Sequence, residues 1–329
     1  MTKPLAVSLG DPAGVGPELI CAAFAKRRAL NLPRFVVLGG AGALRRAAAG
    51  RGLDLAIATI ASPEDEVGDA LAVLDIGDAR CDPGRPTGDG ARLALASLEE
   101  GVRRTLAGDA GALVTMPIAK DRLADVGFAF PGQTEFLADR CGLRHDEAVM
   151  MLAGPRLRAV PLTVHCALAD VPKRLTRELI VTKGRIVAAT LRRDFGIARP
   201  RLAVAGLNPH AGEQGRMGRE EIDIIAPAIA QLADEGIDAV GPIAGDALFT
   251  ERIRATYDAA LAMYHDQALI PVKALDFDEG VNLTCGLPIV RTSPDHGTAF
   301  DIAGKGLADP GATIAALRMA AECAGRRDG

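Results

Sequence analysis

The sequence predicts an α/β fold in which helices cover both faces of a sheet. Three observations lead to this prediction. Short apolar runs of strand length alternate with longer segments of helical periodicity, the runs are apolar throughout, and the alternation continues along the 329-residue chain. Apolar strands separated by helices are typical of sheets that are buried on both faces. The length allows one large domain or two of ordinary size.

The elements follow one another in a regular order. The expected strands are 5–9, 35–38, 112–118, 149–152, 159–164, 202–207 and 259–264. The expected helices are 18–30, 91–106, 134–141, 176–195, 220–235 and 312–324. No internal repeat occurs, and no linker rich in Ser, Gly or Pro divides the chain. If there are two domains, we therefore expect them to share strands or exchange chain segments.

Composition and charge exclude several classes of function. Hydrophobic residues make up 49% and charged residues 24% of the chain, as in ordinary globular proteins. The net charge of −4 and the lack of a basic cluster argue against a nucleic-acid partner. No signal peptide or membrane-length apolar run is readable, and the six cysteines form no C-x-x-C pair. We expect a cytoplasmic protein with neither a membrane nor a nucleic-acid partner.

Two glycine-rich segments follow expected strands, but neither fits the dinucleotide-binding fingerprint. The segment Gly-Asp-Pro-Ala-Gly-Val-Gly-Pro-Glu at 10–18 could hold an anion at a helix N-terminus, or it could be a structural turn. The last glycine of G-x-G-x-x-G is replaced by Leu19 in this segment and by Arg45 in the segment that begins at Gly40. Any nicotinamide site must therefore be built in another way.

Three of the five histidines stand just beyond expected strands, at His165, His210 and His265. Ligands bind beyond the carboxyl ends of strands in open α/β sheets, so the three imidazoles could converge on a divalent metal. Taken singly, each could instead be a hydrogen-bonded structural histidine. Asp246 and Asp266 could orient a ligand, accept a proton or cap a helix. Neither H-E-x-x-H nor G-x-S-x-G occurs, which argues against a zinc protease and a serine hydrolase.

Four segments resemble the 4-hydroxythreonine-4-phosphate dehydrogenase family of vitamin B6 biosynthesis, in the family's order and along nearly the whole chain. They are 10–18, 208–213 (Asn-Pro-His-Ala-Gly-Glu), 263–267 (Met-Tyr-His-Asp-Gln) and 291–299 (Arg-Thr-Ser-Pro-Asp-His-Gly-Thr-Ala). The resemblance implies an α/β/α sandwich like isocitrate and isopropylmalate dehydrogenases, with two domains and a cleft between them. It implies a cofactor-side domain of 1–120 plus 275–329, and a metal-binding and dimerisation domain of 121–274.

The resemblance also implies the cofactors. Residues 296–306 are similar to the loop that grips adenosine in isopropylmalate and isocitrate dehydrogenases. This likeness implies that NAD or NADP is contacted by His296, Gly297, Thr298, Ala299 and Asp301. The family's metal ligands correspond to His165, His210 and His265, which would bind Zn, Co or Mg. The family is a homodimer whose active site is shared across the interface.

The family's substrate-binding positions correspond to Thr134, Lys273, Asn282 and Arg291. Lys and Arg are cationic donors for a phosphate or a carboxylate, and Thr and Asn add neutral hydrogen bonds. Outside the family, the same residues would be ordinary surface polar residues. Gln133 stands where the family usually has a substrate-contacting His. Gln can donate a hydrogen bond, but it cannot carry a charge at neutral pH.

The expected reaction is an NAD(P)- and metal-dependent oxidation of 4-phosphohydroxy-L-threonine to a β-keto acid. This acid decarboxylates to 3-amino-2-oxopropyl phosphate, a precursor in pyridoxal phosphate biosynthesis. Asp246, Asp266 and Lys120 are the candidates for the proton transfer. Because of Gln133, a related dehydrogenase acting on a four-carbon sugar-acid phosphate or an aromatic cis-dihydrodiol stays open. Two other classes also stay open: a phosphotransacetylase-like acyl transferase and a non-catalytic metabolite sensor.

Overall fold

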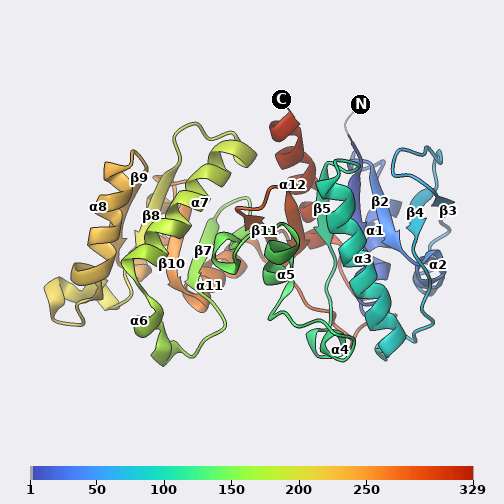
Figure 1. The fold of residues 1–329 in the computed structure, drawn as a ribbon, viewed down its shortest axis with the longest axis horizontal. Coiled ribbons are helices and arrows are strands. Elements are labelled where there is room, and N and C mark those ends of the chain that lie inside the picture. The colour runs from blue at the N-terminus through green and yellow to red at the C-terminus, as the bar shows by residue number, and fades with distance from the viewer. Residues whose placement is uncertain (1–2, 329) are drawn as a thin grey trace. The chain divides into compact units, whose positions relative to one another are not determined.

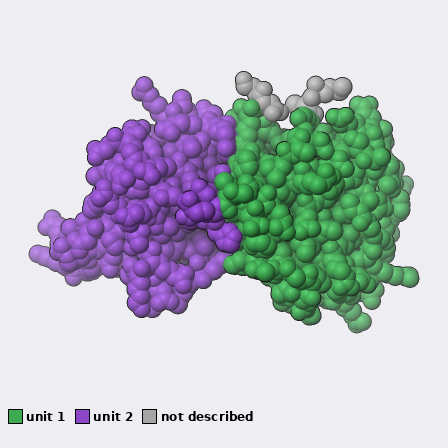
Figure 2. Space-filling model, in the orientation of Figure 1, with its two compact units in different colours: residues 1–143, 287–329 green, residues 144–286 purple. Residues whose placement is uncertain are grey.

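The structure is a computed structural model that describes residues 3–328. It divides into two compact units, coloured differently in Figure 2. Unit 1 consists of Met1–Leu143 and Leu287–Gly329, and unit 2 of Arg144–Gly286. Both units alternate strands with helices, so the predicted α/β fold is confirmed. The functional domain boundaries expected near residues 120 and 274 stay a prediction.

Unit 1 contains a parallel sheet with strand order β3-β4-β2-β1-β5-β12. Its strands are β1 (Leu5–Ser8), β2 (Phe35–Gly39), β3 (Ile57–Ile60), β4 (Leu71–Asp75), β5 (Ala112–Thr115) and β12 (Arg291–Pro294). Its helices are α1 (Gly16–Ala25), α2 (Ala41–Gly50), α3 (Gly88–Leu106), α4 (Lys120–Ala124), α5 (Gln133–Arg140) and α12 (Gly311–Asp328). Helix α3 packs on β1, β2 and β5 and crosses the front of the strands in Figure 1.

Unit 2 contains a mixed sheet with strand order β11-β6-β7-β10-β8-β9. Its strands are β6 (Val149–Ala153), β7 (Arg158–Thr163), β8 (Arg201–Ala205), β9 (Asp238–Ile243), β10 (Ala259–Tyr264) and β11 (Val281–Cys285). Its helices are α6 (Val171–Arg174), α7 (Arg177–Phe195), α8 (Ala226–Asp234), α9 (Gly245–Leu248), α10 (Glu251–Arg254) and α11 (His265–Asp276). Short helical turns complete the unit: η1 (His145–Glu147), η2 (Leu168–Asp170), η3 (Pro209–Gly215) and the π-helical turn η4 (Glu221–Ile225).

Strand direction in unit 2 follows from the length of the connections. β6 is antiparallel to β7 and to β11, whereas β7, β10, β8 and β9 run parallel. The chain passes from β6 to β7 through a tight turn in which Gly154 N–H donates to the Leu157 carbonyl at 2.9 Å. A parallel connection needs a crossover of about a dozen residues, so this turn can join only antiparallel strands. Helices α7 and α11 supply the longer crossovers and pack on the sheet (Figure 1).

Most predicted elements are present, and their ends differ for identifiable reasons. The expected strand 112–118 ends at Thr115, because Pro117 has no N–H for a strand ladder. The expected helix 176–195 is observed as α7, with the Thr176 hydroxyl accepting from Leu179 N–H and Gly196 in the left-handed conformation at its end. Five strands were not predicted: β3, β4, β9, β11 and β12. In β11 and β12, polar residues such as Asn282 and Ser293 interrupt the apolar pattern.

Within residues 3–328, no helix has both the length and the apolar character needed to cross a membrane.

Candidate active site

The three histidines of unit 2 follow the ends of neighbouring parallel strands. His165 lies two residues beyond β7, His265 directly follows β10, and His210 lies five residues beyond β8. β10 pairs in parallel with both β7 and β8, so the three strands end at the same edge of the sheet. The side chains of His165 and His210 are exposed, and that of His265 is half-buried. The strand-end placement predicted from the sequence is therefore present.

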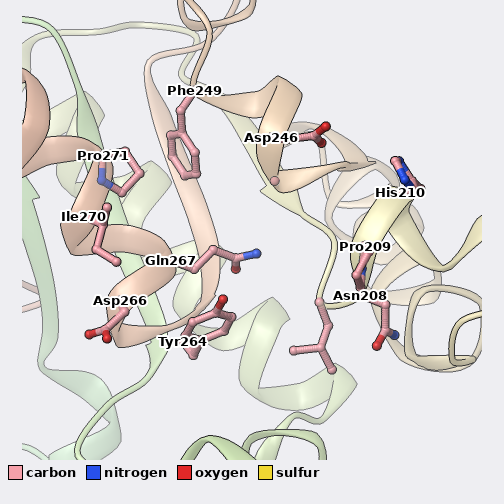
Figure 3. A pocket seen from close by; sticks show the side chains of 12 residues that line it. Asn208, Pro209, His210, Asp246, Phe249, Tyr264, Asp266, Gln267, Ile270 and Pro271 are labelled. Atoms are coloured by element: carbon pink, nitrogen blue, oxygen red, sulfur yellow. The ribbon is translucent and has the colours of Figure 1, made fainter.

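Two adjacent hollows form at this edge. The first, of about 300 Å³, is lined by Thr163, Val164, His165, Cys166, Leu168, Val171, Tyr264, His265 and Asp266. The second, of about 560 Å³, is lined by His210, Asp246, Tyr264, Asp266 and Gln267 among others. In Figure 3, Gln267 extends into the second hollow, between the helix that carries Ile270 and Pro271 and the segments of Asp246 and His210. Tyr264 and Asp266 border both hollows, so the two hollows are adjacent.

His265 is held in one orientation by the residue that follows it. Its Nδ1 lies 2.7 Å from Asp266 Oδ1. Since an ionised carboxylate only accepts hydrogen bonds, Nδ1 carries the proton and Nε2 keeps its lone pair. The ring centroids of His165 and His265 are 6.1 Å apart, so two imidazoles border one hollow. A carboxylate behind an imidazole is the usual support of a histidine that binds a metal.

His210 lies on a strained turn. Its φ is 52°, and five consecutive residues of η3, at 210–214, have positive φ. Left-handed backbone costs a non-glycine L-residue about 1–2 kcal/mol. Such strain persists only where surrounding contacts fix it, and it concentrates at functional sites.

Gln267, which was not among the site residues predicted from the sequence, links the ends of two strands by hydrogen bonds. Its Nε2 donates to the Gly206 carbonyl at 2.8 Å, and its Oε1 accepts from Met263 N–H at 2.7 Å. The amide therefore joins the end of β10 to the segment that follows β8. Its presence within the motif at 263–267 was the available signal.

The described residues do not assemble a complete metal centre. Within residues 3–328, no group of three or more His, Cys, Asp or Glu side chains is close enough to hold a metal ion. The expected convergence of three imidazoles is thus present only as the pair His165 and His265, with His210 at the adjacent hollow.

Arg291 of unit 1 is a buried cation in a cluster of polar side chains. Its exposed fraction is 3%, and both its Nε (3.1 Å) and its Nη2 (2.7 Å) donate to Thr115 Oγ1. Nη2 also donates to Gln133 Oε1 at 2.8 Å, while Gln133 Nε2 donates to the Met116 carbonyl at 3.2 Å. Burial lowers the pKa of Arg291 to about 10, so the guanidinium keeps its charge at neutral pH.

Two further candidates lie beside this cluster in unit 1. Thr134 follows Gln133 in the first turn of α5, where backbone N–H groups favour anions. Lys120 begins α4, and its Nζ would lie 3.5 Å from a Cβ added at Gly132. Thr134, Gln133 and Lys120 therefore flank the same short segment.

Lys273 and Asn282 belong to unit 2. Lys273 is exposed on α11, whereas Asn282 is half-buried on β11. Asn282 Oδ1 is buried and has no hydrogen-bond partner among the described residues. Because a buried carbonyl oxygen without a donor costs free energy, a ligand that donates a hydrogen bond would stabilise it.

The glycine-rich loop at 296–306 packs against the glycine-rich segment at 10–18, and both lie in unit 1. Val15 N–H donates to the Thr298 carbonyl at 3.0 Å. A Cβ at Gly14 would lie 2.9 Å from that carbonyl, so only glycine allows the approach. The segment at 10–18 therefore supports the loop at 296–306, as well as being a turn before α1.

His296 presents a free acceptor in this loop. Its Nδ1 lies 2.9 Å from the Gly297 carbonyl, which can only accept, so Nδ1 carries the proton. Its Nε2 is buried and has no partner among the described residues. Ala299 has a φ of 45°, and Asp301 is exposed. The loop thus offers an imidazole acceptor to a donor such as an amine or a hydroxyl.

A family model described as pyridoxal phosphate biosynthetic protein PdxA matches residues 31–320. The chain belongs to this PdxA family. The family expected from the sequence is therefore confirmed.

Relatives of known name or structure cover 98 to 99% of the chain. A relative from Erythrobacter litoralis, named 4-hydroxythreonine-4-phosphate dehydrogenase, is 62% identical over 99% of this chain and 98% of its own. The crystal structure of the protein of that name from Klebsiella pneumoniae is 38% identical, with a TM-score of 0.90 over 98% of both chains. A terephthalate 1,2-cis-dihydrodiol dehydrogenase from Burkholderia xenovorans is 31% identical, with a TM-score of 0.67 over 98% of both chains.

In this member of the PdxA family, the residue at 133 has a structural partner that its sequence position did not reveal. Gln133 was expected only as a contact to substrate, but its amide bridges Arg291 and the Met116 carbonyl. Thr115, which the sequence reasoning did not select, holds the same guanidinium. A threonine at the end of an apolar strand was its only sequence signal.

Proposed function

We propose that this PdxA-family protein is an NAD(P)-dependent, divalent-metal-dependent 4-hydroxythreonine-4-phosphate dehydrogenase. It oxidises 4-phosphohydroxy-L-threonine to a β-keto acid, which decarboxylates to 3-amino-2-oxopropyl phosphate in pyridoxal phosphate biosynthesis. The observation that carries the proposal is the pair His165 and His265 in one hollow, with Asp266 orienting His265. The names of relatives at 50 to 62% identity support the same activity.

The residues fit a divalent metal in part. The lone pair left on His265 Nε2, and the place of His165 in the same hollow, suit a Zn-like or Co-like ion. His210 would be the third imidazole. The family's arrangement, in which a homodimer shares its active site across the interface, would complete a centre that the described residues of one chain do not assemble. When bound, the ion supplies Lewis-acid stabilisation of negative charge on a substrate oxygen.

The polar cluster of unit 1 suits the anionic end of the substrate. Arg291 remains charged although it is buried, and Thr134 stands at the N-terminus of α5. A guanidinium in a low-dielectric setting binds a phosphate more strongly than an exposed one. Among the unit 2 candidates, Lys273 is an exposed cation, and Asn282 Oδ1 would accept from a substrate hydroxyl or amino group. Gln133 contributes mainly by fixing Arg291.

The oxidation removes a proton from the carbinol oxygen and a hydride from the carbinol carbon. Asp246 borders the hollow that contains His210 and is exposed, so it can exchange the proton with water. Asp266 is hydrogen-bonded to His265, so its role is to orient that imidazole. Lys120, at the start of α4, is the alternative proton acceptor. The β-keto acid then loses carbon dioxide, because the ketone accepts the electron pair of the broken bond.

The loop at 296–306 suits the adenosine part of NAD or NADP. His296 Nε2 is a buried acceptor, and the backbone of Gly297, Thr298 and Ala299 can approach a ligand closely. Asp301 would accept from ribose hydroxyls. The nicotinamide, when bound, accepts the hydride.

The other functions are less favoured. A sugar-acid phosphate or a cis-dihydrodiol dehydrogenase would use the same hydride chemistry, but the relatives at 50 to 62% identity are named 4-hydroxythreonine-4-phosphate dehydrogenase. An acyl transferase would not need strand-end histidines, one of which is hydrogen-bonded to a carboxylate. A metabolite sensor would bind the substrate without turnover. We further propose that the protein is a cytoplasmic homodimer.

The testing experiment measures reduction of NAD or NADP by absorbance with 4-phosphohydroxy-L-threonine, before and after removal of metal with a chelator. We expect turnover that the chelator abolishes and that Zn²⁺, Co²⁺ or Mg²⁺ restores. Sedimentation gives the oligomeric state in parallel. Turnover of a four-carbon sugar-acid phosphate or a cis-dihydrodiol, but not of this substrate, would instead support the related dehydrogenases. Binding without turnover by folded, metal-loaded protein would support a sensor.

A further inference from the structure

The backbone that presents His210 needs support from outside its own turn. Residues 210–214 all have positive φ, and only Gly212 among them lacks a side chain. A run of left-handed L-residues is intrinsically unfavourable, so a contact elsewhere must hold it. Inside the turn, the Asn208 carbonyl accepts from Ala211 N–H at 3.1 Å, and the Gly212 carbonyl accepts from Met217 N–H at 3.1 Å. These bonds close the turn but do not anchor it to the unit.

The anchor is a buried carboxylate on the next element. Glu221 begins the π-helical turn η4 and is only 3% exposed. Its Oε1 accepts from Asn208 N–H at 2.7 Å, and its Oε2 accepts from Asn208 Nδ2 at 2.9 Å. Glu220 Oε2 accepts from the same Nδ2 at 2.8 Å. Asn208, which lies two residues before His210, is therefore held by hydrogen bonds from both its backbone and its side chain.

Glu221 also contacts the centre of the left-handed turn. A Cβ added at Gly212 would lie 2.5 Å from Glu221 Oε2. Gly212 has a φ of 75° and is buried, so glycine is needed there both for the backbone angle and for the room it leaves to the carboxylate. The turn thus rests on the carboxylate at its centre, and Asn208 is bonded to the same group.

We propose that Glu221 is a positioning residue, which fixes the left-handed turn and so presents the His210 imidazole before any ligand binds. π-helical turns are rare and often occur at functional sites, which agrees with this assignment. The importance of His210 rests on the proposed function, but the positioning of its ring is a property of the chain alone. Glu221 acts through His210 and does not itself touch substrate.

The test compares Glu221→Gln with Asp223→Asn. Gln has nearly the same shape, but one oxygen becomes an NH₂ group that cannot accept from Asn208. Asp223 lies on the same π-helical turn and is bonded at the surface to Arg219, so it is a matched control. The first readout is the imidazole NMR signal of His210 in metal-free protein, assigned with His210→Asn. The second readout is the Kd for Co²⁺ or Zn²⁺, measured by competition with a chelator.

We expect Glu221→Gln to shift and broaden the His210 signal without changing those of His145 and His296, and to weaken metal binding about 10- to 100-fold. Asp223→Asn should leave both readouts unchanged. An unchanged His210 signal in Glu221→Gln overturns the proposal. If the wild-type protein binds no divalent metal, the metal part of the proposed function fails, and the NMR signal alone decides whether Glu221 positions His210.

A second variant guards against a loss of folding in Glu221→Gln. Gly212→Ala keeps the carboxylate but places a methyl group against it, so the same contact is broken from the other side. We expect the same displacement of the His210 signal, with the far-ultraviolet circular dichroism unchanged. A folded Gly212→Ala protein whose His210 signal matches wild type contradicts the proposed role.

Discussion

The two units present their candidate functional groups in opposite ways. In unit 1, Arg291 is 3% exposed and bonded to Thr115 and Gln133, so a charge is kept within a buried frame. In unit 2, His165 and His210 are exposed at strand ends, and both have positive φ. Unit 1 therefore orients its guanidinium by hydrogen bonds to the side chain. Unit 2 orients its imidazoles through strained backbone and through neighbouring carboxylates.

The difference follows from the chemistry that each unit is proposed to perform. A guanidinium gains strength as a phosphate binder when it is withdrawn from water, provided that its other N–H groups are satisfied. An imidazole that binds a metal must instead keep the lone pair of one ring nitrogen accessible, so it is oriented by a hydrogen bond from its other ring nitrogen. The buried guanidinium of unit 1 and the exposed imidazoles of unit 2 therefore meet the same requirement. Each side chain is ordered before its ligand binds. The following predictions test this contrast.

The largest effect is expected in unit 2. His265→Ala removes the imidazole that Asp266 orients, and turnover should fall by more than about 100-fold. His145→Ala, an exposed histidine on η1, is the control and should leave turnover unchanged. The absorbance assay of nicotinamide reduction measures both variants. Wild-type turnover in His265→Ala would exclude it from the active site.

A smaller effect is expected from the buried frame of unit 1. Thr115→Val keeps the shape of the side chain but leaves two guanidinium N–H groups without their acceptor, at a cost of about 1–3 kcal/mol. We expect a KM for the phosphorylated substrate that rises about tenfold, with a smaller change in kcat. Thr105→Val removes a hydrogen bond to the Gly101 carbonyl inside α3 and is the matched control. If both variants lower Tm and neither changes KM, then Arg291 does not bind substrate.

Gln133→His sharpens the comparison by placing a titratable group in the buried frame. The imidazole can become charged at acidic pH, whereas the amide cannot, but the neighbouring Arg291 guanidinium and burial lower the imidazole pKa below its ordinary value of about 6.5. We expect KM to fall several-fold more between pH 8 and pH 5 in the variant than in the wild type. The substrate phosphate titrates in the same range, so the ratio of the two KM values is the quantity to measure. A ratio that does not change with pH would place residue 133 away from the substrate.

The smallest effect concerns Glu18, a buried carboxyl of unit 1 that is not among the proposed site residues. Burial raises the pKa of Glu18, while Arg51 and the backbone amides of Gly304 and Gly306 partly offset the rise. Between its ordinary pKa and the raised one, the folded protein binds more protons than the unfolded chain, so stability falls as pH rises through that window. We expect Glu18→Gln to flatten this fall in Tm and Glu66→Gln, at an exposed position, to retain it. Equal slopes in both variants would contradict burial as the cause.

Part of the site could be predicted because its signals are local in sequence. A histidine that follows an apolar strand lies at the sheet edge whatever the rest of the fold does, and His265 directly follows β10 as expected. Its partner Asp266 is the next residue, so that contact needs no long-range information. The motifs that carry the family resemblance are local in the same sense, and the match of the family model to residues 31–320 confirms the family that they indicated.

The sequence by itself determined the α/β fold, the strand-end histidines and the family, because these depend on periodicity and on short motifs. Only the tertiary structure decided the contacts between distant residues. Arg291 and Thr115 are 176 positions apart, and they meet because β12 pairs with β5. Glu221 reaches Asn208 only because the chain turns back through a left-handed segment. Neither partner could be read from spacing, since strand register and unusual backbone angles are fixed by packing across the whole unit.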